Sequence, residues 1–242
     1  MEPDGTAARK IVKTRLLSRH LGEERTLRIF VPPGRGPGRP GPVVCCQDGE
    51  QFFHFGRIVT AAQQLARQEA RILPLIVGID CDPARRTEEY APSGRRFAAY
   101  CRFVTEEAIP FAERAFGAAP SPEERIAAGD SLGGTVSLHL ALDHPELFRR
   151  VIAFSGAFLP DSLARAGRET RLDGLKVYQL VGTRETAVRT DRGTFDFLGL
   201  NRNMRMLLEE RGAKVEYVED EGDHRWGFWQ AFTADALRCT LP

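Results

Sequence analysis

A serine enclosed by glycines, in Gly129-Asp130-Ser131-Leu132-Gly133, has the residue types and spacing for nucleophilic chemistry. The stretch fits the pattern G-x-S-x-G, in which a sharp turn between a strand and a helix exposes the serine hydroxyl. Its context agrees, because the apolar segment RIAAGD precedes the serine and the run LGGTVSLHLAL follows it. The pattern predicts a nucleophile for acyl transfer at Ser131. The alternative is a serine that only caps a helix.

A serine hydroxyl is a weak nucleophile and needs a base, and this class of turn places its partners in the chain order Ser, acid, His. His20 and His54 precede the serine. His139 lies inside the helix that follows it, and His144 lies at the end of that helix. His224 remains, on the glycine-containing loop EDEGDHRWG, and is predicted to be the general base.

The acid is expected after the apolar segment LKVYQLVG, and Glu185 is the first carboxylate there. Its role would be to hold the imidazole tautomer and to stabilise the imidazolium. Asp191 and Asp196 lie nearby and remain alternatives. The triad predicted from residue order is therefore Ser131, His224 and Glu185.

Two backbone amides are predicted to bind the oxyanion. The amide of Leu132 opens the helix after the serine, where N–H groups lack intrahelical partners. The second donor is expected in the loop QDGEQFF after the segment PVVCC, where Asp48-Gly49 can turn the chain and free the amide of Glu50 or Gln51. We select Glu50.

These residues require a scaffold that brings the ends of several strands together. Short apolar segments alternate with helical patterns along the chain, which is typical of a mostly parallel sheet with helices on both faces. Two alternating segments at 11–18 and 25–32 predict antiparallel edge strands. Further strands are predicted within 42–47, 73–80, 125–130, 149–156, 175–182 and 213–220, and helices within 57–70, 96–116, 132–144, 200–211 and 226–241. Ligands of such sheets bind at the carboxyl ends of the strands.

Length and composition predict one domain over residues 11–242, after a flexible tail at 1–10. The Pro/Gly-rich stretch 32–42 contains a GxGxxG spacing, but a strand segment follows it where a dinucleotide site needs a helix. We interpret it as a loop. No metal and no organic cofactor is expected, because the His and Cys positions form no ligand pattern.

The chain carries 34 basic and 33 acidic residues, so no overall field favours nucleic acid or an anionic membrane. The expected partner is a small molecule, and the oligomeric state stays open. Five cysteines without a CxxC pair, a polar N-terminus and the lack of a long apolar run predict a cytoplasmic protein with reduced thiols.

Taken together, the motifs QDGEQFF, GIDCDPARRTEEY, GDSLGG, HPELFRRVIAFSG, VGTRET and EGDHRWGFW resemble the esterase D-like branch of the α/β-hydrolases. This branch includes enterochelin esterases, feruloyl esterases, S-formylglutathione hydrolase and mycolyltransferases. The resemblance implies an α/β-hydrolase fold over roughly residues 25–240. VGTRET resembles the family segment that carries the acid, which supports Glu185, although relatives usually have an aspartate there.

The resemblance also implies candidate substrate-binding residues. Arg86, Glu89 and Tyr90 match a family stretch R-x-x-E/D-Y beside the active site, where they would position a polar part of the substrate. A salt-bridged structural loop is the alternative. Several aromatic side chains, including the candidate Trp226, lie near the predicted site loops and either line an acyl pocket or belong to the core: Phe52, Phe53, Phe158, Trp226, Phe228 and Trp229.

The stretch 157–174, where related hydrolases can insert a lid, is short and polar, so an open cleft without a large lid domain is expected. The predicted function is a serine carboxylic ester hydrolase acting on small or medium polar esters through an acyl-enzyme. A siderophore trilactone esterase, an acyltransferase of the same fold and a non-catalytic binding module remain alternatives.

Overall fold

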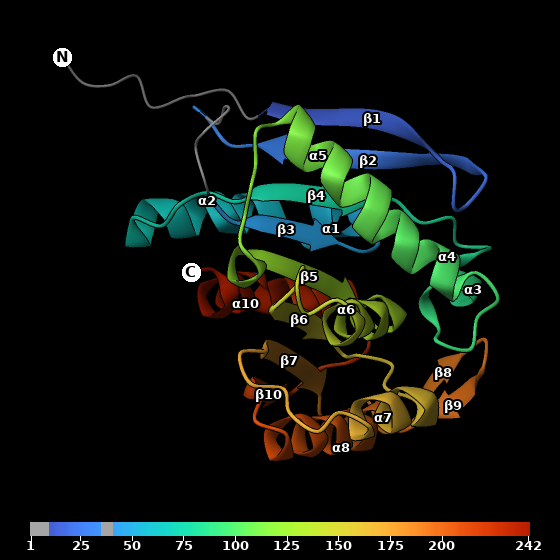
Figure 1. Cartoon of the computed structure of the whole chain (residues 1–242). Coiled ribbons are helices and arrows are strands. Elements are labelled where there is room, and N and C mark those ends of the chain that lie inside the picture. Colours follow the sequence, from blue (N-terminus) through green and yellow to red (C-terminus); the bar gives the residue numbers. More distant parts are fainter. Residues whose placement is uncertain (1–9, 35–40) are drawn as a thin grey trace.

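The computed structural model describes residues 10–34 and 41–242 and contains a central sheet of eight strands (Figure 1). The strands lie in the order β1-β2-β4-β3-β5-β6-β7-β10. Their bounds are β1 Lys10–Ser18, β2 Glu23–Val31, β3 Val43–Cys46, β4 Leu75–Ile79, β5 Arg125–Asp130, β6 Arg150–Phe154, β7 Lys176–Gly182 and β10 Lys214–Asp220. A separate two-stranded hairpin consists of β8 Val188–Thr190 and β9 Gly193–Phe195.

Burial explains the direction of the strands. Every residue of β3, β4 and β5 is buried, as expected for parallel strands that are covered on both faces. β1 alternates between exposed and partly buried residues and pairs antiparallel with β2, which is antiparallel to β4. The register pairs Cys46 with both Gly78 and Ala128, so the carboxyl ends of β3, β4 and β5 meet at one edge of the sheet.

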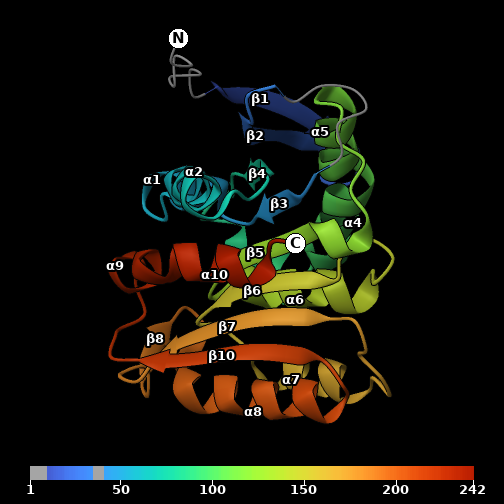
Figure 2. The same cartoon turned by 90° about the vertical axis from the view of Figure 1, so that its left-hand side faces the viewer.

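Helices cover both faces of the sheet (Figure 2). One face carries α1, α2, α9 and α10, whose apolar side chains pack with those of the strands into one core cluster. The other face carries α3 to α8 and the larger cluster. Helix bounds are α1 Gly49–His54, α2 Ile58–Glu69, α3 Arg86–Tyr90, α4 Phe97–Arg102, α5 Ile109–Ala115, α6 Leu132–Asp143, α7 Pro160–Gly167, α8 Phe197–Glu210, α9 Trp226–Trp229 and α10 Thr233–Thr240. A π-helical turn, Phe103–Ala108, joins α4 to α5.

The predicted α/β class, with a mostly parallel sheet and antiparallel N-terminal edge strands, is confirmed. Sequence patterns missed the short helices α1, α3 and α7 and the hairpin β8–β9. The hairpin strands have three residues each, too few to show an alternation. No large lid domain occurs between β6 and β7 in the described structure, where only α7 is present.

The termini, the cysteines and the length of the helices were also subjects of prediction. The predicted flexible tail falls almost entirely on residues 1–9 and the predicted loop 32–42 includes residues 35–40, and both of these segments lie outside the described residues. All five cysteines are free, and Cys45, Cys46 and Cys101 are buried. Among the described helices, none has the length and apolar character required to cross a membrane.

Candidate active site

Ser131 lies in a strained turn between β5 and α6, with backbone angles φ 53° and ψ −122°. A residue with a side chain adopts this conformation only where the surrounding structure enforces it. The Ser131 amide donates to the carbonyl of Phe154 in β6, and its carbonyl accepts from the amides of Thr135 and Ala157. These backbone bonds fix the turn at the carboxyl end of the sheet and leave the hydroxyl on the wall of a pocket.

Glycines make this turn sterically possible. A Cβ atom on Gly129 would lie 2.1 Å from the carbonyl carbon of Gly133, which is closer than any side chain can approach. A Cβ on Gly133 would meet the carboxylate of Asp48 at 3.1 Å and Gln47 at 3.3 Å. The start of α6 therefore packs directly against β5 and against the loop after β3.

The hydroxyl of Ser131 belongs to a continuous chain of polar contacts. Its Oγ lies 3.0 Å from Nε2 of His224, and Nδ1 of the same imidazole lies 2.6 Å from Oε2 of Glu185. His224 follows β10 on a loop, and Glu185 follows β7. The structure thus brings together the three residues that were predicted from their order and position in the sequence.

The carboxylate of Glu185 is held by more than the histidine. Its side chain is fully buried, and its Oε1 accepts hydrogen bonds from the Ser155 hydroxyl at 2.6 Å and from the Gly182 amide at 2.8 Å. The Ser155 hydroxyl also accepts from the indole N–H of Trp229 at 2.7 Å. Sequence reasoning missed Ser155. Its position directly after β6, which the motif AFSG shows, was the available signal.

Two aromatic rings fix the imidazole from the sides. The ring of Phe197 lies 4.6 Å from that of His224, and the ring of Trp229 lies 5.0 Å from it, both in edge-to-face geometry. Such contacts restrict the rotation of the imidazole and favour a single orientation. His224 therefore presents Nε2 to the serine with its other nitrogen directed at a buried carboxylate.

The alternative acids lie elsewhere. Asp196 is the N-cap of α8 and accepts a hydrogen bond from the Gly199 amide at 2.9 Å. Asp191 lies at the turn of the β8–β9 hairpin, where its carboxylate accepts a hydrogen bond from the Thr87 hydroxyl at 2.5 Å. Neither makes a recorded contact with His224 in the described structure.

The amides predicted for the oxyanion belong to the two loops that meet at the serine. Leu132 is the first residue of α6 and lines the pocket. Glu50 is the second residue of α1, which follows β3 directly, and its side chain pairs with Arg28 of β2. Glu50 does not line the pocket, so its amide remains a prediction.

Arg86 anchors the loop after β3. Its guanidinium donates to both carboxylate oxygens of Asp48, at 2.8–3.1 Å, and to the carbonyl of Asp130 at 3.1 Å. Burial would lower the pKa of Arg86, but the charge of Asp48 outweighs it and raises the pKa. Burial, together with the charge of Asp48, raises the pKa of Asp130 to about 7, and Arg86 partly offsets this.

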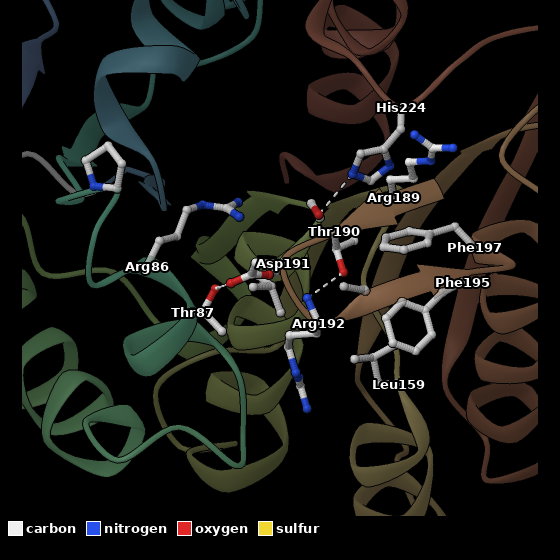
Figure 3. A pocket seen from close by; sticks show the side chains of 14 residues that line it. Arg86, Thr87, Leu159, Arg189, Thr190, Asp191, Arg192, Phe195, Phe197 and His224 are labelled. Atoms are coloured by element: carbon white, nitrogen blue, oxygen red, sulfur yellow. Dashed lines mark hydrogen bonds between the residues drawn. The ribbon is translucent and has the colours of Figure 1, made fainter. Parts of the chain in front are cut away.

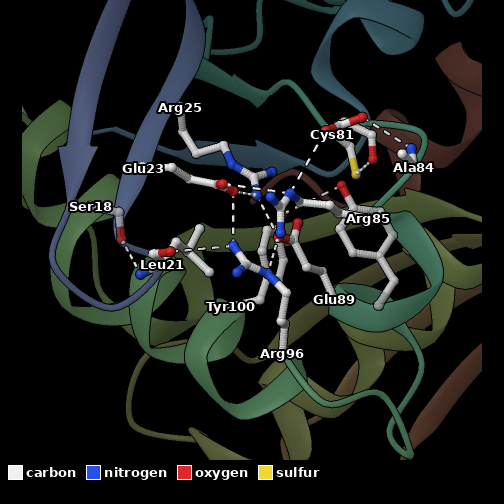
Figure 4. A network of polar contacts seen from close by, with 12 residues as sticks. Ser18, Leu21, Glu23, Arg25, Cys81, Ala84, Arg85, Glu89, Arg96 and Tyr100 are labelled. Atoms are coloured by element: carbon white, nitrogen blue, oxygen red, sulfur yellow. Dashed lines mark hydrogen bonds and ion pairs between the residues drawn. The ribbon is translucent and has the colours of Figure 1, made fainter.

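Glu89 and Tyr90 are buried beside the pocket and do not line it. Glu89 accepts ion-paired hydrogen bonds from Arg25 and Arg96 in the polar network of Figure 4. The Tyr90 hydroxyl accepts from the Asp48 amide at 3.1 Å, and its ring lies 5.3 Å below the Arg86 guanidinium. Glu89 and Tyr90 therefore fit the alternative of a salt-bridged structural loop. Arg86 belongs to the same network and also lines the pocket.

The pocket at Ser131 has a volume of about 370 Å³ and lies between α3 and the β8–β9 hairpin (Figure 3). Its apolar lining includes Leu132, Ala157, Leu159, Phe195 and Phe197. Its polar lining comes from α3 and from the hairpin, at Arg86, Thr87, Arg189, Thr190, Asp191 and Arg192. The hairpin, which the sequence did not predict, thus supplies a wall of the site.

None of the six aromatic residues expected near the pocket lines it. Trp226 donates its indole N–H to Gln51 at 2.7 Å and packs on Phe52 at a ring distance of 4.8 Å. Phe52, Phe158 and Phe228 are buried in the core clusters. The rings that do line the pocket lie at the end of the missed hairpin, at Phe195 of β9, and directly after it, at Phe197 of α8.

A hydroxyl, an imidazole and a buried carboxylate in this order can carry out proton transfer coupled to nucleophilic attack. A group of three or more His, Cys, Asp or Glu side chains able to hold a metal does not occur within 10–34 and 41–242.

The strand order and the serine at the turn after β5 define a hydrolase of the α/β type. Residues 18–239 match the model of the putative esterase family, and the chain belongs to that family. Its family therefore makes it an esterase. The recognition from sequence motifs is confirmed.

Several known proteins resemble the chain in sequence or in fold. YjcH of Bacillus subtilis, an uncharacterised protein, is 33% identical over 233 residues, covering 96% of this chain and 97% of YjcH. An acetyl esterase of Caldicellulosiruptor saccharolyticus is 25% identical and covers 64% of this chain and 68% of that protein. A ferulic acid esterase structure has a TM-score of 0.79 at 17% identity, covering 96% and 98%. The enterochelin esterase of Shigella flexneri has a TM-score of 0.76 at 21% identity, covering 94% and 58%.

Proposed function

We propose that this protein is a serine carboxylesterase in which Ser131 is the nucleophile, His224 the general base and Glu185 the triad acid. The observation that carries the proposal is the pair of contacts from Ser131 Oγ to His224 at 3.0 Å and from His224 to Glu185 at 2.6 Å. Both lie at a pocket that a small ester can enter. The residues come from loops after β5, β7 and β10, so we treat residues 11–242 as one domain.

The reaction proceeds in two halves. In the first, Ser131 Oγ attacks the ester carbonyl while Nε2 of His224 takes the hydroxyl proton, and the imidazolium then returns that proton to the departing alcohol. In the second half, His224 takes a proton from water as the water attacks the acyl-serine, and the imidazolium then returns that proton to Ser131 Oγ as the acid departs. Glu185 stabilises the imidazolium in both halves through the contact of its carboxylate with Nδ1.

The negative charge on the tetrahedral oxygen requires preorganised donors. The Leu132 amide supplies one, because it opens α6 next to the serine. The Glu50 amide supplies the second, in the first turn of α1, and the loop before α1 lies so close to Gly133 that a side chain there would meet Asp48. Arg86 keeps that loop in place through Asp48 and so acts on the site indirectly.

Small or medium polar esters are the substrate class that the pocket favours. A volume of about 370 Å³ accommodates a short acyl chain and a compact alcohol, and its lining mixes apolar and charged side chains. We also assign the enzyme to the cytoplasm, because Cys45 and Cys46 lie side by side as buried free thiols.

A siderophore trilactone esterase is the second candidate. The fold shared with the Shigella flexneri enterochelin esterase favours it. It uses the same three residues and differs only in substrate. Turnover of a trilactone at a rate well above that of simple esters would distinguish it.

The test is hydrolysis of 4-nitrophenyl acetate and butyrate by the wild type and by Ser131→Ala, combined with fluorophosphonate labelling followed by intact mass. We expect turnover and one adduct per chain in the wild type, and neither in Ser131→Ala. Folding of the variant is checked by its circular dichroism and Tm. Equal turnover in both proteins, or no turnover and no adduct in folded wild type, contradicts the proposal.

A further inference from the structure

The wall of the pocket opposite α3 is cationic. It is formed by the β8–β9 hairpin, from which Arg189 and Arg192 both line the pocket (Figure 3). The apolar lining, at residues such as Leu159 and Phe195, contributes no charge. Esters that enter this pocket therefore meet two arginine residues in the same lining as the serine and the histidine.

These two guanidinium groups differ from that of Arg86 in one respect. Arg86 is neutralised by the carboxylate of Asp48 at 2.8 Å. The Arg189 side chain makes no ion pair or hydrogen bond with any described residue, and the guanidinium of Arg192 donates only to the neutral hydroxyl of Ser93, at 3.2 Å. The hairpin cations thus have no protein counterion.

The carboxylate on the pocket wall does not cancel them. Asp191 lies between the two arginines in the chain, but its Oδ2 accepts from Thr87 and it forms no ion pair with either. Two positive charges, from Arg189 and Arg192, and one negative charge, from Asp191, give the hairpin wall a net charge of one positive unit. A planar guanidinium binds a carboxylate through two parallel N–H···O bonds.

We propose that the preferred substrates are esters that carry a second, anionic group, a carboxylate, which Arg189 binds with help from Arg192. This inference rests on the proposed function, because it names the substrate class of the same site. The apolar lining would hold the carbon chain between the ester and the carboxylate. The anionic group belongs either to the acyl part or to the alcohol part, and the hairpin position is compatible with both.

The experiment compares size-matched pairs of esters. The acyl arm uses mono-4-nitrophenyl glutarate against methyl 4-nitrophenyl glutarate, corrected for spontaneous hydrolysis. The alcohol arm uses 4-acetoxybenzoate against methyl 4-acetoxybenzoate. In each arm the readout is the ratio of kcat/KM for the anionic ester to that for the neutral ester. Intrinsic reactivity cancels when this ratio is compared between proteins.

We expect Arg189→Gln to lower this ratio about five-fold or more in at least one arm, since an exposed charge pair with two hydrogen bonds has this strength. Arg189→Glu should lower it further, and Arg189→Lys should restore part of it. Raising the salt concentration should lower the ratio of the wild type towards that of Arg189→Gln. Arg67→Gln makes the same charge change on α2, remote from the pocket, and should leave the ratio unchanged.

The inference is overturned if Arg189→Gln, Arg192→Gln and their double variant change the ratio less than two-fold in both arms. Hydrolysis of the neutral esters distinguishes this outcome from failure of the proposed function. If the wild type hydrolyses the neutral esters with dependence on Ser131 but shows no arginine-dependent preference, only the substrate class is wrong. If neither kind of ester is hydrolysed, the proposed function fails and the substrate class fails with it.

Discussion

Glu185 and His224 are joined by a 2.6 Å contact between a carboxylate with no side-chain exposure and an imidazole with 19% exposure. A buried carboxylate that loses its charge can no longer stabilise the imidazolium. Glu185→Gln should therefore lower kcat about 10³-fold or more on 4-nitrophenyl butyrate. Glu185→Asp keeps the carboxylate but moves it one methylene away from His224, so its kcat should lie between those of the wild type and Glu185→Gln. Asp196→Asn, which keeps an N-cap side chain on α8, should retain activity. Full activity of Glu185→Gln would move the acid to Asp191 or Asp196.

Ser155 is expected to position the acid. Its hydroxyl links Glu185 to Trp229, and its backbone has φ 45°. Ser155→Ala and Ser155→Gly both remove the hydroxyl, but glycine tolerates this backbone conformation better than alanine. Both should lower kcat about 10- to 100-fold with little change in KM, because one hydrogen bond to a charged group is lost. Similar losses in both variants attribute the effect to the hydroxyl. Wild-type activity of Ser155→Ala would contradict this role, because alanine keeps the Cβ of serine and loses only the hydroxyl.

The turn at Ser131 requires glycine at position 129. Gly129→Ala places a methyl group 2.1 Å from the backbone of Gly133, so the turn must open. We expect a loss of stability of about 3 kcal/mol or more, measured by urea denaturation. Gly167→Ala in α7 is the control, because the atom nearest to an added Cβ there is the end of the Arg211 side chain, at 4.0 Å. Wild-type stability and activity of Gly129→Ala would contradict the geometry of the turn.

Asp130 should make stability dependent on pH. Burial raises its pKa to about 7 from an ordinary value of 3.8, so the folded state binds this proton more tightly than the unfolded state. Burial lowers the pKa of His139 to about 4 and gives stability the opposite dependence over the same range, so the effect of Asp130 is read as a difference between two proteins. The free energy of unfolding of the wild type relative to that of Asp130→Asn should fall by about 2 kcal/mol as pH rises from 5 to 7 and then level off, measured by urea denaturation across pH 5–8. Asp82→Asn changes an exposed carboxylate and should leave the slope unchanged.

The hairpin is attached to α3 by the hydrogen bond from Thr87 to Asp191. Thr87→Val keeps the shape of the side chain and removes the donor. We expect faster hydrogen–deuterium exchange in the hairpin, over residues 188–195, together with a higher KM for small esters. Thr170→Val, an exposed position without a recorded contact, is the control. Unchanged exchange would show that the hairpin holds its position without this bond.

Sequence reasoning located the fold and the three central residues because their signals are local. The segment RIAAGD corresponds residue for residue to β5, since a fully buried parallel strand is a continuous apolar run. Ser131 was identified by its glycines. His224 and Glu185 were selected by chain order and by their position just after strands, which the topology converts into proximity.

The walls of the pocket could not be predicted in the same way. The β8–β9 hairpin has charged and small residues without a period, and its pairing of Val188 with Phe195 depends on the turn between them. Arg86 has a recognisable motif, but its contact with Asp48 joins residues 38 positions apart. Similarly, the burial of Glu89 depends on Arg25 of β2 and Arg96, which no local pattern connects.

One connection, from the end of β7 to the start of α8, contains both Glu185 and the hairpin that bears Arg189. Glu185 is tied to the scaffold by Ser155 and by the Gly182 amide, whereas the hairpin reaches the rest of the protein through side chains such as that of Thr87. The hairpin can therefore be exchanged or lengthened without disturbing the acid. This separation makes the segment after Glu185 a natural place to graft new substrate preferences onto an intact catalytic centre.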